Sequence, residues 1–365
     1  MLTKYEVLAD RLTDSIAANL KKGVYKLPTE AALCRQYHVS RQTVRQALML
    51  LQARGLITTR QGSGSYATGL SASPDRNTIG MLVSSDQEYI YPELIADIRS
   101  VLSSHGFTLK LFVTEDRLAK ERELLQEIAQ VPPRGLIVEG CRSALPNPNL
   151  DLYEQLHRKA VPILFLHEYY RTLPWAVCIR DDNFYGGYLL AQHLYTNGHT
   201  EIAAFFRLDS MQGIERYQGF TTYLRDMGYM APDDRIGWFT GAELEELRKK
   251  QDTHFLLEFI QKQVKSCSAI VCHDDETAYW LVKELQYTGI RVPHDVSVVS
   301  FGNSYLSELS GVRITSLAHK PHEMGTRTAE CMLQALRGIP PAPQELSWEI
   351  IVRESDSSPE YHPHR

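Results

Sequence analysis

Two arginine side chains one helical turn apart, Arg41 and Arg45, could read the edges of DNA bases. A guanidinium donates two parallel hydrogen bonds to O6 and N7 of guanine, and residues four apart lie on one face of a helix. Gln42 and Thr43, which stand between them, could add hydrogen bonds to bases or phosphates. Two arginines on a lone helix are more often a solvated surface, so this hypothesis depends on the elements that would hold the helix.

Two predicted helices precede the arginines. An apolar residue at every fourth position from Leu8 to Leu20 predicts a first amphipathic helix. Pro28 and Thr29 begin a second, short helix with Thr29 as its N-cap, and this helix ends near Tyr37. Glu30 then lies in the first turn, at the positive end of the helix dipole.

A third predicted helix carries the arginines themselves. After a tight turn it is capped by Ser40, runs from Arg41 to about Arg54 and stops at Gly55 in the C′ position. The face opposite the arginines is apolar and is expected to point inward: Val44, Ala47, Leu48 and Leu51.

A β-hairpin is predicted after the third helix. Two β-prone runs, 56–60 and 65–68, are separated by the glycine-rich segment 61–64. The hairpin tip is narrow enough to enter a minor groove, with Arg60 and Gln61 beside it. Helix, turn, helix and hairpin in this order predict a winged helix-turn-helix whose third helix enters the major groove.

The charge distribution agrees with a DNA-binding N-terminal part. Residues 1–70 hold ten Lys/Arg and four Asp/Glu, a balance of +6, so a net charge of −5 leaves −11 for the remainder. Phosphate attracts the first part and repels the second. Because basic surfaces also arise by chance, charge alone does not decide the function.

The motifs of this part resemble those of the GntR family of winged-helix regulators over nearly all of residues 1–70. They are Leu27-Pro28-Thr29-Glu30, Val39–Leu48, Leu51, Gly55-Leu56-Ile57 and Gln61–Ser65. The resemblance implies contacts with DNA at Lys4, Tyr5, Glu30, Arg35, Arg41, Arg45, Gln61 and Gly64. For Glu30 three roles stay open: accepting from a cytosine amino group, orienting a neighbouring arginine, or capping the second helix.

From Asn77 onward short apolar strands alternate with helical stretches such as 93–105 and 118–130. This alternation predicts an α/β fold with parallel sheets, and the run is long enough for two stacked lobes. We expect a linker at 71–76, a two-lobed domain at 77–353 and a polar tail at 354–365. The strands are expected at Thr78–Val83, Thr108–Val113, Gly135–Val138, Ile163–His167, Ile202–Phe206, Ala269–His273 and Val296–Phe301.

Several classes of function lack their sequence signatures. No phosphate-binding loop, nucleophile elbow or HExxH motif is present, so we expect no enzyme and no cofactor. His273–Glu276 could mimic a metal site, but Asp275 and Glu276 suit the first turn of a helix better. The six cysteines form no zinc-ligand spacing. Without a membrane-length apolar run or a signal peptide, a cytoplasmic protein is expected.

Polar side chains gather where the predicted strands end, which is where open parallel sheets bind ligands. Carboxylates, amides and a guanidinium bond to vicinal hydroxyls, and aromatic rings cover the C–H face of a sugar. Each residue alone could equally be core or solvated. Together they predict a sugar-type effector site: Tyr89, Tyr91, Glu139, His167, Glu168, Arg216, Asp274 and Asn303.

Residues 77–353 resemble the LacI/GalR sugar-responsive domain, a relative of the periplasmic sugar-binding proteins. In that family the positions of Arg216 and Asp274 contact the effector. The family usually has Asn at Asp274 and Asp at Gly302, so Asn303 is expected to take over from Gly302. The matching segments are 135–139, 182–183, 186–187, 193–194, 198–199, Arg216, 219–220, 269–272, 274–275, Ala278, Gly289, 292–293 and Leu317.

A GntR-type head on a LacI-type body is the arrangement of the arabinose-responsive repressors of Gram-positive bacteria. The chain is similar to them in Tyr89–Pro92, 143–145, 148–149 and 212–213. The resemblance implies a repressor with L-arabinose as its effector. We expect a homodimer on a palindromic operator, with sugar binding moving the two heads off their spacing.

Three alternative functions require residues or signals that differ from those of a sugar-responsive repressor. A phosphorylated sugar or acidic metabolite would need extra cations at the strand ends. An enzyme with a DNA-binding appendage lacks a paired-carboxylate or phosphate-loop signature. A transport-type binding protein would carry an export signal and no basic head. The cations available for the first alternative are Arg142, Arg171, Arg180 and Arg207.

Overall fold

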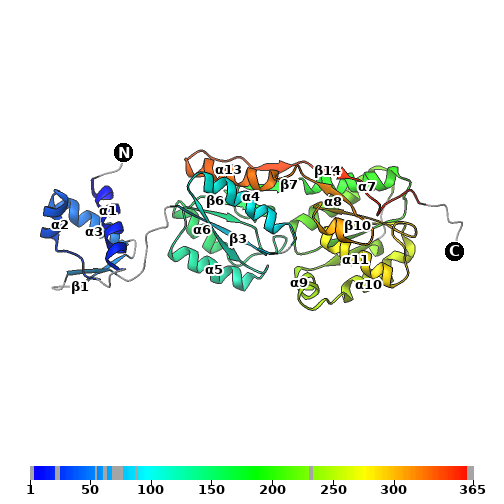
Figure 1. The fold of residues 1–365 in the computed structure, drawn as a ribbon, viewed down its shortest axis with the longest axis horizontal. Coiled ribbons are helices and arrows are strands. Elements are labelled where there is room, and N and C mark those ends of the chain that lie inside the picture. The colour runs from blue at the N-terminus through cyan, green and yellow to red at the C-terminus, as the bar shows by residue number, and fades with distance from the viewer. Residues whose placement is uncertain are drawn as a thin grey trace. The chain divides into compact units, whose positions relative to one another are not determined.

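The computed structural model describes residues 4–20, 25–53, 56–60, 64–67, 77–87, 89–229 and 233–359. The chain forms two compact units, a smaller one within Met1–Asn77, called the head, and a larger one that begins at Thr78, called the body (Figure 1). The predicted fold class is confirmed: a small helical head with a hairpin, and a body with two mainly parallel sheets.

The head contains three helices and an antiparallel hairpin in the predicted order. The first two caps are also as predicted, because Thr29 Oγ1 accepts from Ala32 N at 3.3 Å and Ser40 Oγ accepts from Thr43 N at 3.2 Å. The predicted cap at Gly55 and the linker at 71–76 lie outside the described residues. The elements are α1 (Lys4–Leu20), α2 (Glu30–Tyr37), α3 (Arg41–Ala53), β1 (Ile57–Arg60) and β2 (Gly64–Ala67).

One apolar core holds these elements together. The inward faces of α1 and α3 meet there, and burial of these side chains supplies most of the stabilisation of so small a unit. The segment before α2 runs alongside β2 and is hydrogen-bonded to it. Leu27 N donates to Ser65 O at 2.9 Å, and Ala67 N donates to Tyr25 O at 2.7 Å. The core residues include Leu8, Leu12, Ile16, Leu33, Val44, Ala47, Leu51 and Ile57.

The first lobe of the body, lobe 1, is a parallel six-stranded sheet in the order β13-β7-β6-β5-β3-β4. Helices α4 and α13 pack on one face, and α5 and α6 on the other. The elements are β3 (Thr78–Val83), α4 (Tyr91–Ser104), β4 (Thr108–Val113), α5 (Leu118–Gln130), β5 (Gly135–Val138), α6 (Leu150–Arg158), β6 (Ile163–Leu166), β7 (Cys178–Asp181), α13 (Glu323–Leu336) and β13 (Gln344–Leu346).

Lobe 2 is a six-stranded sheet in the order β14-β12-β11-β10-β8-β9, parallel except for β14. Helices α7 and α8 cover one face, and α10 and α11 the other. The elements are α7 (Asn183–Thr196), β8 (Ile202–Arg207), α8 (Met211–Asp226), β9 (Ile236–Phe239), α9 (Gly241–Lys250), α10 (His254–Gln263), β10 (Ala269–Cys272), α11 (Asp275–Tyr287), β11 (Ser297–Phe301), α12 (Leu306–Leu309), β12 (Thr315–Ala318) and β14 (Glu349–Ile351), with short 3-10 turns at Asp233–Arg235 and Val264–Ser266.

The chain passes between the two lobes after β7, after β12 and after β13. One imidazole contacts all three passages. His319 Nε2 lies 2.6 Å from Asp181 Oδ1, its Nδ1 lies 3.0 Å from the Ser347 carbonyl, and its ring stacks on Trp348 at 3.7 Å. The two lobes are therefore joined where their strands end.

The segment that the sequence assigns to a polar tail begins inside lobe 2. Ser355 is fully buried and its Oγ accepts from Thr315 N at 2.8 Å. Asp356 Oδ2 lies 2.7 Å from His193 Nε2, and the Ser357 carbonyl lies 2.8 Å from His199 Nε2. The packed part of the body thus extends past residue 353, to at least Ser357.

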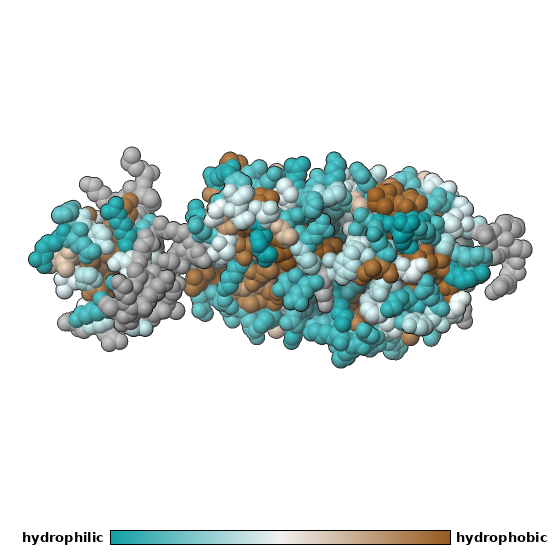
Figure 2. All heavy atoms as spheres, in the orientation of Figure 1, coloured by the Kyte–Doolittle hydropathy of each residue, from teal (hydrophilic) through white to brown (hydrophobic). Residues whose placement is uncertain are grey.

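No helix among the described residues is long and apolar enough to cross a membrane. On the face of the body drawn in Figure 2, hydrophilic residues predominate and the apolar ones form separate patches.

Candidate functional site

The first turns of α3 present polar side chains on the face opposite the core of the head. Arg41, Gln42 and Arg45 are exposed and Thr43 is half-buried, whereas Val44 is fully buried. The separation follows from the 3.6-residue period of the helix, which turns Val44 inward while Arg41 and Arg45 share the outer face. This face is shaped as the sequence predicts for a helix that enters a DNA groove.

Glu30 joins α2 to α3 through Arg45. The Arg45 Nε donates to both carboxylate oxygens of Glu30, at 3.2 and 3.3 Å. Thr29, and not Glu30, supplies the N-cap of α2. Of the three roles left open by the sequence, the geometry matches the one in which Glu30 orients a neighbouring arginine.

The other residues expected at DNA come from four places in the head. Arg35 is exposed in the last turn of α2, and Tyr5 is half-buried against the core from α1. Gly64, with φ of +105°, opens β2 beside the hairpin tip, a conformation that favours glycine. Lys4 begins α1 and Arg60 ends β1, while Gln61 lies outside the described residues.

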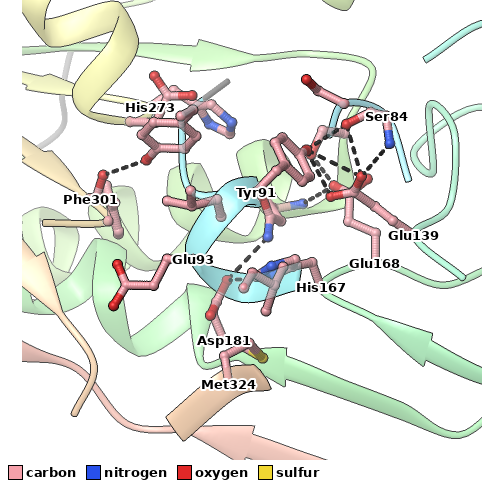
Figure 3. A pocket seen from close by; sticks show the side chains of 18 of the residues that line it. Ser84, Tyr91, Glu93, Glu139, His167, Glu168, Asp181, His273, Phe301 and Met324 are labelled. Carbon is pink, nitrogen blue, oxygen red and sulfur yellow. Dashed lines mark hydrogen bonds and ion pairs between the residues drawn. The ribbon is translucent and has the colours of Figure 1, made fainter. Parts of the chain in front are cut away.

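In the body, a pocket of about 540 Å³ lies between the carboxyl ends of the two sheets (Figure 3). The parallel strands all point their carboxyl ends at this interface, so the loops that follow them converge there. All eight residues predicted for an effector site line it: Tyr89, Tyr91, Glu139, His167, Glu168, Arg216, Asp274 and Asn303.

On lobe 1, Glu139 is held by two neighbours. One carboxylate oxygen accepts from Ser84 N and Ser84 Oγ, both at 2.8 Å, and the Tyr91 hydroxyl donates to the carboxylate at 3.0 Å. Burial, together with the charge of Glu139, raises the pKa of Tyr91 well above its usual value, so its hydroxyl stays protonated. The carboxylate of Glu139 is therefore fixed in place by three hydrogen bonds.

Glu168 reaches from lobe 1 to the first turn of α8 on lobe 2. It accepts a bond from the Ser210 hydroxyl and another from Gln212 N at 3.3 Å. Burial raises the pKa of Glu168 to about 7, although the charge of Arg207 and the bond from Ser210 act against the shift. Glu168 therefore gains and loses its proton in the physiological pH range. Its side chain can donate a hydrogen bond when protonated and accept one when ionised.

Asp181, which the sequence analysis missed, is the central carboxylate of the pocket. It is 3% exposed and lies at the end of β7. Its oxygens lie 2.6 Å from His319 Nε2, 3.4 Å from His167 Nδ1 and 3.1 Å from Gln212 Nε2, which donates to it. Burial raises the pKa of Asp181, but the two neighbouring imidazoles, of which His319 is hydrogen-bonded to it, outweigh burial and hold the pKa well below its usual value.

The pKa of His167, the neighbour of Asp181, shifts in the opposite direction. Burial lowers the pKa of His167, while the neighbouring carboxylate of Asp181 raises it, and the net direction is upward. His167 and Asp181 therefore form a buried ion pair in the wall of lobe 1. Finding Asp181 from the sequence would require predicting the strand β7. The short run Cys178–Asp181 gives little apolar signal for a strand.

Arg216 rises from α8 and is buried against aromatic rings. Its Nε donates to Asn183 Oδ1 at 2.9 Å and its Nη1 to the His273 carbonyl. The guanidinium lies 4.2 Å from the centroid of the Phe301 ring, a cation–π contact. Burial and the charges of Arg216 and Arg207 lower the pKa of His273 well below its usual value, so that imidazole is neutral.

Asp274 caps α11, because its Oδ1 accepts from Thr277 N at 2.8 Å. Asp275 and Glu276 lie in the first turn of α11, as predicted, and each also has specific partners. Asp275 is fully buried and accepts from Ser316 Oγ at 2.6 Å and from Ser304 N at 2.5 Å. Glu276 pairs with Arg248 at 2.5 Å.

Asn303 lies exposed at the pocket rim with φ of +47°. Its side-chain oxygen accepts from Arg353 Nη2 at 2.5 Å and its backbone N donates to Ser316 Oγ at 3.0 Å. Because that oxygen is already bonded, Asn303 is a weaker substitute for a residue at position 302 than the sequence suggests.

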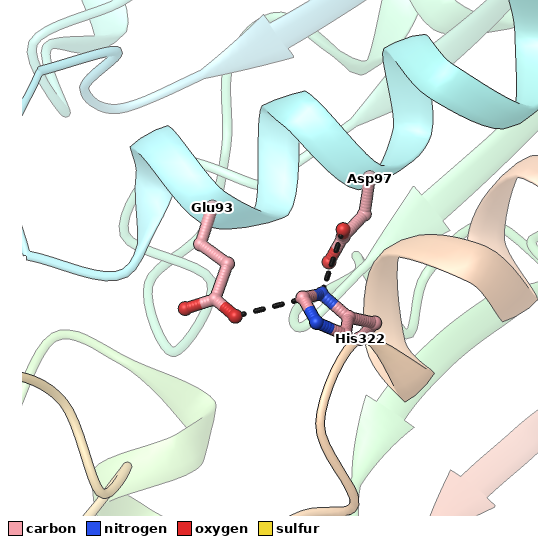
Figure 4. A group of neighbouring side chains, drawn as sticks. All are labelled: Glu93, Asp97 and His322. Atoms are coloured by element: carbon pink, nitrogen blue, oxygen red, sulfur yellow. Dashed lines mark hydrogen bonds and ion pairs between the residues drawn. The ribbon is translucent and has the colours of Figure 1, made fainter.

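Glu93, Asp97 and His322 form a group at the same rim that could hold a metal ion (Figure 4). His322 Nδ1 lies 2.9 Å from Asp97 Oδ1 and 3.5 Å from Glu93 Oε1. Glu93 and His322 are exposed, so solvated ion pairs suffice to explain the arrangement.

Two family profiles match the chain. "Bacterial regulatory proteins, gntR family" covers residues 4–66, and "Periplasmic binding protein-like domain" covers residues 191–355. The fold of the body is also that of a periplasmic binding protein/LacI transcriptional regulator from Alkaliphilus metalliredigens, with a TM-score of 0.64 and 20% identity over 77% of this chain and 99% of that chain. These matches and the two sites define a transcription regulator with a DNA-binding head and a ligand-binding body.

Two curated relatives are similar over most of their length. The chain is 31% identical to the arabinose metabolism transcriptional repressor of Geobacillus stearothermophilus, over 92% of each chain. It is 30% identical to the repressor of that name from Halalkalibacterium halodurans, over 92% of this chain and 90% of the relative. The chain belongs to this family of transcriptional repressors with a sugar-binding effector domain, which are regulators and not enzymes.

Proposed function

We propose that this repressor holds its operator with two heads and that L-arabinose, bound between the lobes of the body, releases it. The observation that carries the proposal is the charge of the pocket. Among the described residues that line it are eleven Asp/Glu and five Lys/Arg. A pocket of this kind disfavours an anion and suits a neutral ligand with many hydroxyls.

The arginines of the pocket are already paired. Arg207 bonds to Asp116 and, at 2.7 Å, to Asp209. Arg248 bonds to Glu276, and Arg216 Nη2 lies 3.9 Å from Asp181. Of the two lysines that line the pocket, Lys249 pairs with Glu245 and Lys320 is exposed. In the buried part of the pocket, a phosphorylated sugar or acidic metabolite would need a cation without a carboxylate partner, because burying a further anion among these groups costs free energy. The alternative effectors are therefore disfavoured.

The pocket offers a neutral sugar both hydrogen-bond partners and apolar surface. Carboxylate oxygens of Glu139 and Asp181 accept from hydroxyls, and Arg216 donates. The half-buried ring of Tyr89 offers an apolar face. The identity of the sugar rests on the relatives, whose names place them in arabinose metabolism. The proposed contacts are Tyr89, Tyr91, Glu139, His167, Glu168, Arg216, Asp274 and Asn303.

In the head we propose that α3 lies in the major groove and the hairpin tip in the minor groove. Arg41 and Arg45 would bond to bases, and the exposed residues around them to phosphates and sugar oxygens. The proposed contacts are Lys4, Tyr5, Glu30, Arg35, Arg41, Gln42, Thr43, Arg45, Arg60, Gln61 and Gly64.

Two such heads in a homodimer would match a palindromic operator. The sugar contacts both lobes, so it binds more tightly when they are close together and shifts the population toward that arrangement. The shift is limited by the difference in sugar affinity between the operator-binding state and the released state. Release is proposed to follow from the altered spacing of the two heads.

The test is retention of a labelled operator fragment by the purified protein, followed by fluorescence anisotropy. L-arabinose should release the fragment at concentrations where D-xylose and arabinose 5-phosphate do not. Release by the phosphate alone would replace the neutral effector with an anionic one. If no sugar changes retention, effector control through this pocket is wrong.

A further inference from the structure

One side chain spans the pocket from lobe 1 to lobe 2. Tyr89 lies between β3 and α4, and its hydroxyl donates to the carbonyl of Phe301 at 3.1 Å, 212 positions further along the chain. Phe301 is the last residue of β11, and the bond is drawn as the dashed line at Phe301 in Figure 3. The phenol of Tyr89 therefore covers the carboxyl end of a lobe 2 strand.

Gly302 leaves the space into which the phenol fits. A Cβ at that position would collide with the Tyr89 hydroxyl oxygen and lie 3.3 Å from its Cζ. Gly302 also has φ of +113°, which side-chain-bearing residues rarely adopt. A side chain at position 302 and the phenol of Tyr89 cannot occupy this place together.

The backbone of Tyr89 adopts an uncommon conformation. Its φ is +55°, which is uncommon for an aromatic residue and is kept only where the surroundings compensate for it. Burial, with the charges of Asp275 and Asp274, raises the pKa of Tyr89 well above its usual value, so the hydroxyl remains a donor. A Cβ at position 302 would meet both this hydroxyl and Asp275 Oδ2, so the hydroxyl lies near the acidic first turn of α11.

We propose that Tyr89 is a specificity-determining residue that limits the size of the sugar the pocket accepts. The carboxyl ends of parallel strands are where such sheets bind ligands, and the end of β11 is closed by the phenol. The sugar is thereby confined to the space beside Arg216 and Asp274. This inference rests on the proposed function, since it presumes that the effector is a sugar.

The position that the phenol of Tyr89 fills is suited to binding a sugar hydroxyl. The Phe301 carbonyl accepts a bond there, and the bond is now made by the phenol. If the phenol is removed, that carbonyl can accept from a hydroxyl of a longer sugar instead. Loss of the ring should therefore favour a larger sugar and weaken a small one, which loses the wall it packs against.

The test compares two sugars that differ by one group. D-galactose in its pyranose form has the ring configuration of L-arabinose with an added hydroxymethyl group, so the pair isolates size. Calorimetry on the full chain should show that the wild type prefers L-arabinose by about tenfold or more, the scale on which pockets discriminate one carbon. Tyr89→Ala should lower that preference at least about tenfold.

Tyr89→Phe is the matched control, because it keeps the ring and removes only the hydroxyl. It should retain most of the preference for L-arabinose. Thermal unfolding near the wild-type temperature shows that each variant is folded. An unchanged preference in a folded Tyr89→Ala protein overturns the inference. A wild type that binds neither sugar overturns the proposed effector instead, so the two failures are distinguishable.

Discussion

The head and the pocket of the body use the same kinds of side chain in opposite settings. In the head, the side chains of Arg45 and Glu30 are 68% and 35% exposed, whereas Arg216 and Asp181 in the pocket are each 5% exposed. An exposed ion pair is worth little and is exchanged easily, but a buried charge depends strongly on its partner.

This difference fits the two tasks. Arg45 can leave Glu30 for a base at small cost, which suits reversible contact with a polyanion. Arg216 and Asp181 cannot lose their partners without a large penalty, so a ligand in the pocket must supply equivalent hydrogen bonds. Substitutions in the pocket should therefore affect folding and binding together, while those on the exposed face of the head should affect binding alone.

The largest effect is expected from Asp181→Asn. This change leaves His167, His319 and Arg216 around a neutral amide, and removing one partner of a buried ionic group costs about 3–5 kcal/mol. We expect a loss of unfolding free energy of that order, measured in urea, together with loss of L-arabinose binding in calorimetry.

Asp182→Asn is its matched control, one residue further along. Asp182 caps α7 by accepting from Tyr185 N at 3.0 Å, and Asn is an equally good cap. The control should stay within about 0.5 kcal/mol of the wild type. Equal stability of the two variants would contradict the central role of Asp181.

A second test uses the pH dependence of Glu168. Its pKa rises from 4.5 to about 7 in the folded protein, so the folded state binds the proton more tightly than the unfolded state does. Stability should therefore fall as pH rises from about 4.5 to 7 through this group, by on the order of 3 kcal/mol.

Glu168→Gln removes that dependence, because the amide does not titrate. The difference in unfolding free energy between variant and wild type should shift in favour of the variant as pH rises through this window, then level off above about pH 7. A difference that does not change with pH would show that Glu168 keeps an ordinary pKa.

How much the sequence reveals also differs between the two regions. The head is defined by local signals: Thr29 and Ser40 cap helices within three residues, and Val44 faces the core by helical period alone. All its elements were therefore predictable. In the body seven strands were predicted. Six of them are buried on both faces, which leaves a plain apolar pattern, and the edge strand β4 is partly exposed but rich in β-prone residues.

The remaining strands have no such signal. These strands are β7, β9, β12, β13 and β14, and the pairing of the last two depends on the chain passing between the lobes. Asp181 and His319 gain their partners only through those passages, and nothing in their sequence neighbourhood marks them. The bonding of Asn303 to Arg353 likewise joins segments 50 positions apart.

In the head, Arg41→Ala tests whether the exposed face of α3 reads bases. Loss of one bidentate contact should cost about 1–3 kcal/mol in operator binding and relax the preference at one base pair. Unfolding in urea should be unchanged, because Arg41 is exposed. Anisotropy titrations with operator variants at a fixed salt concentration measure the effect. A uniform loss across all sequences would instead assign Arg41 to phosphate.

The smallest and most informative change is Glu30→Gln, because it has opposite effects on two quantities. Removing the carboxylate removes repulsion from phosphate and should strengthen binding to unrelated DNA. It also frees Arg45 from its orienting partner, whose exposed pairing is worth about 0.2–1 kcal/mol, and should weaken binding to the operator. The ratio of operator to unrelated affinity should fall in wild-type background but not in Arg45→Ala background, since the coupling needs both partners. A fall of equal size in both backgrounds would give Glu30 a base contact of its own.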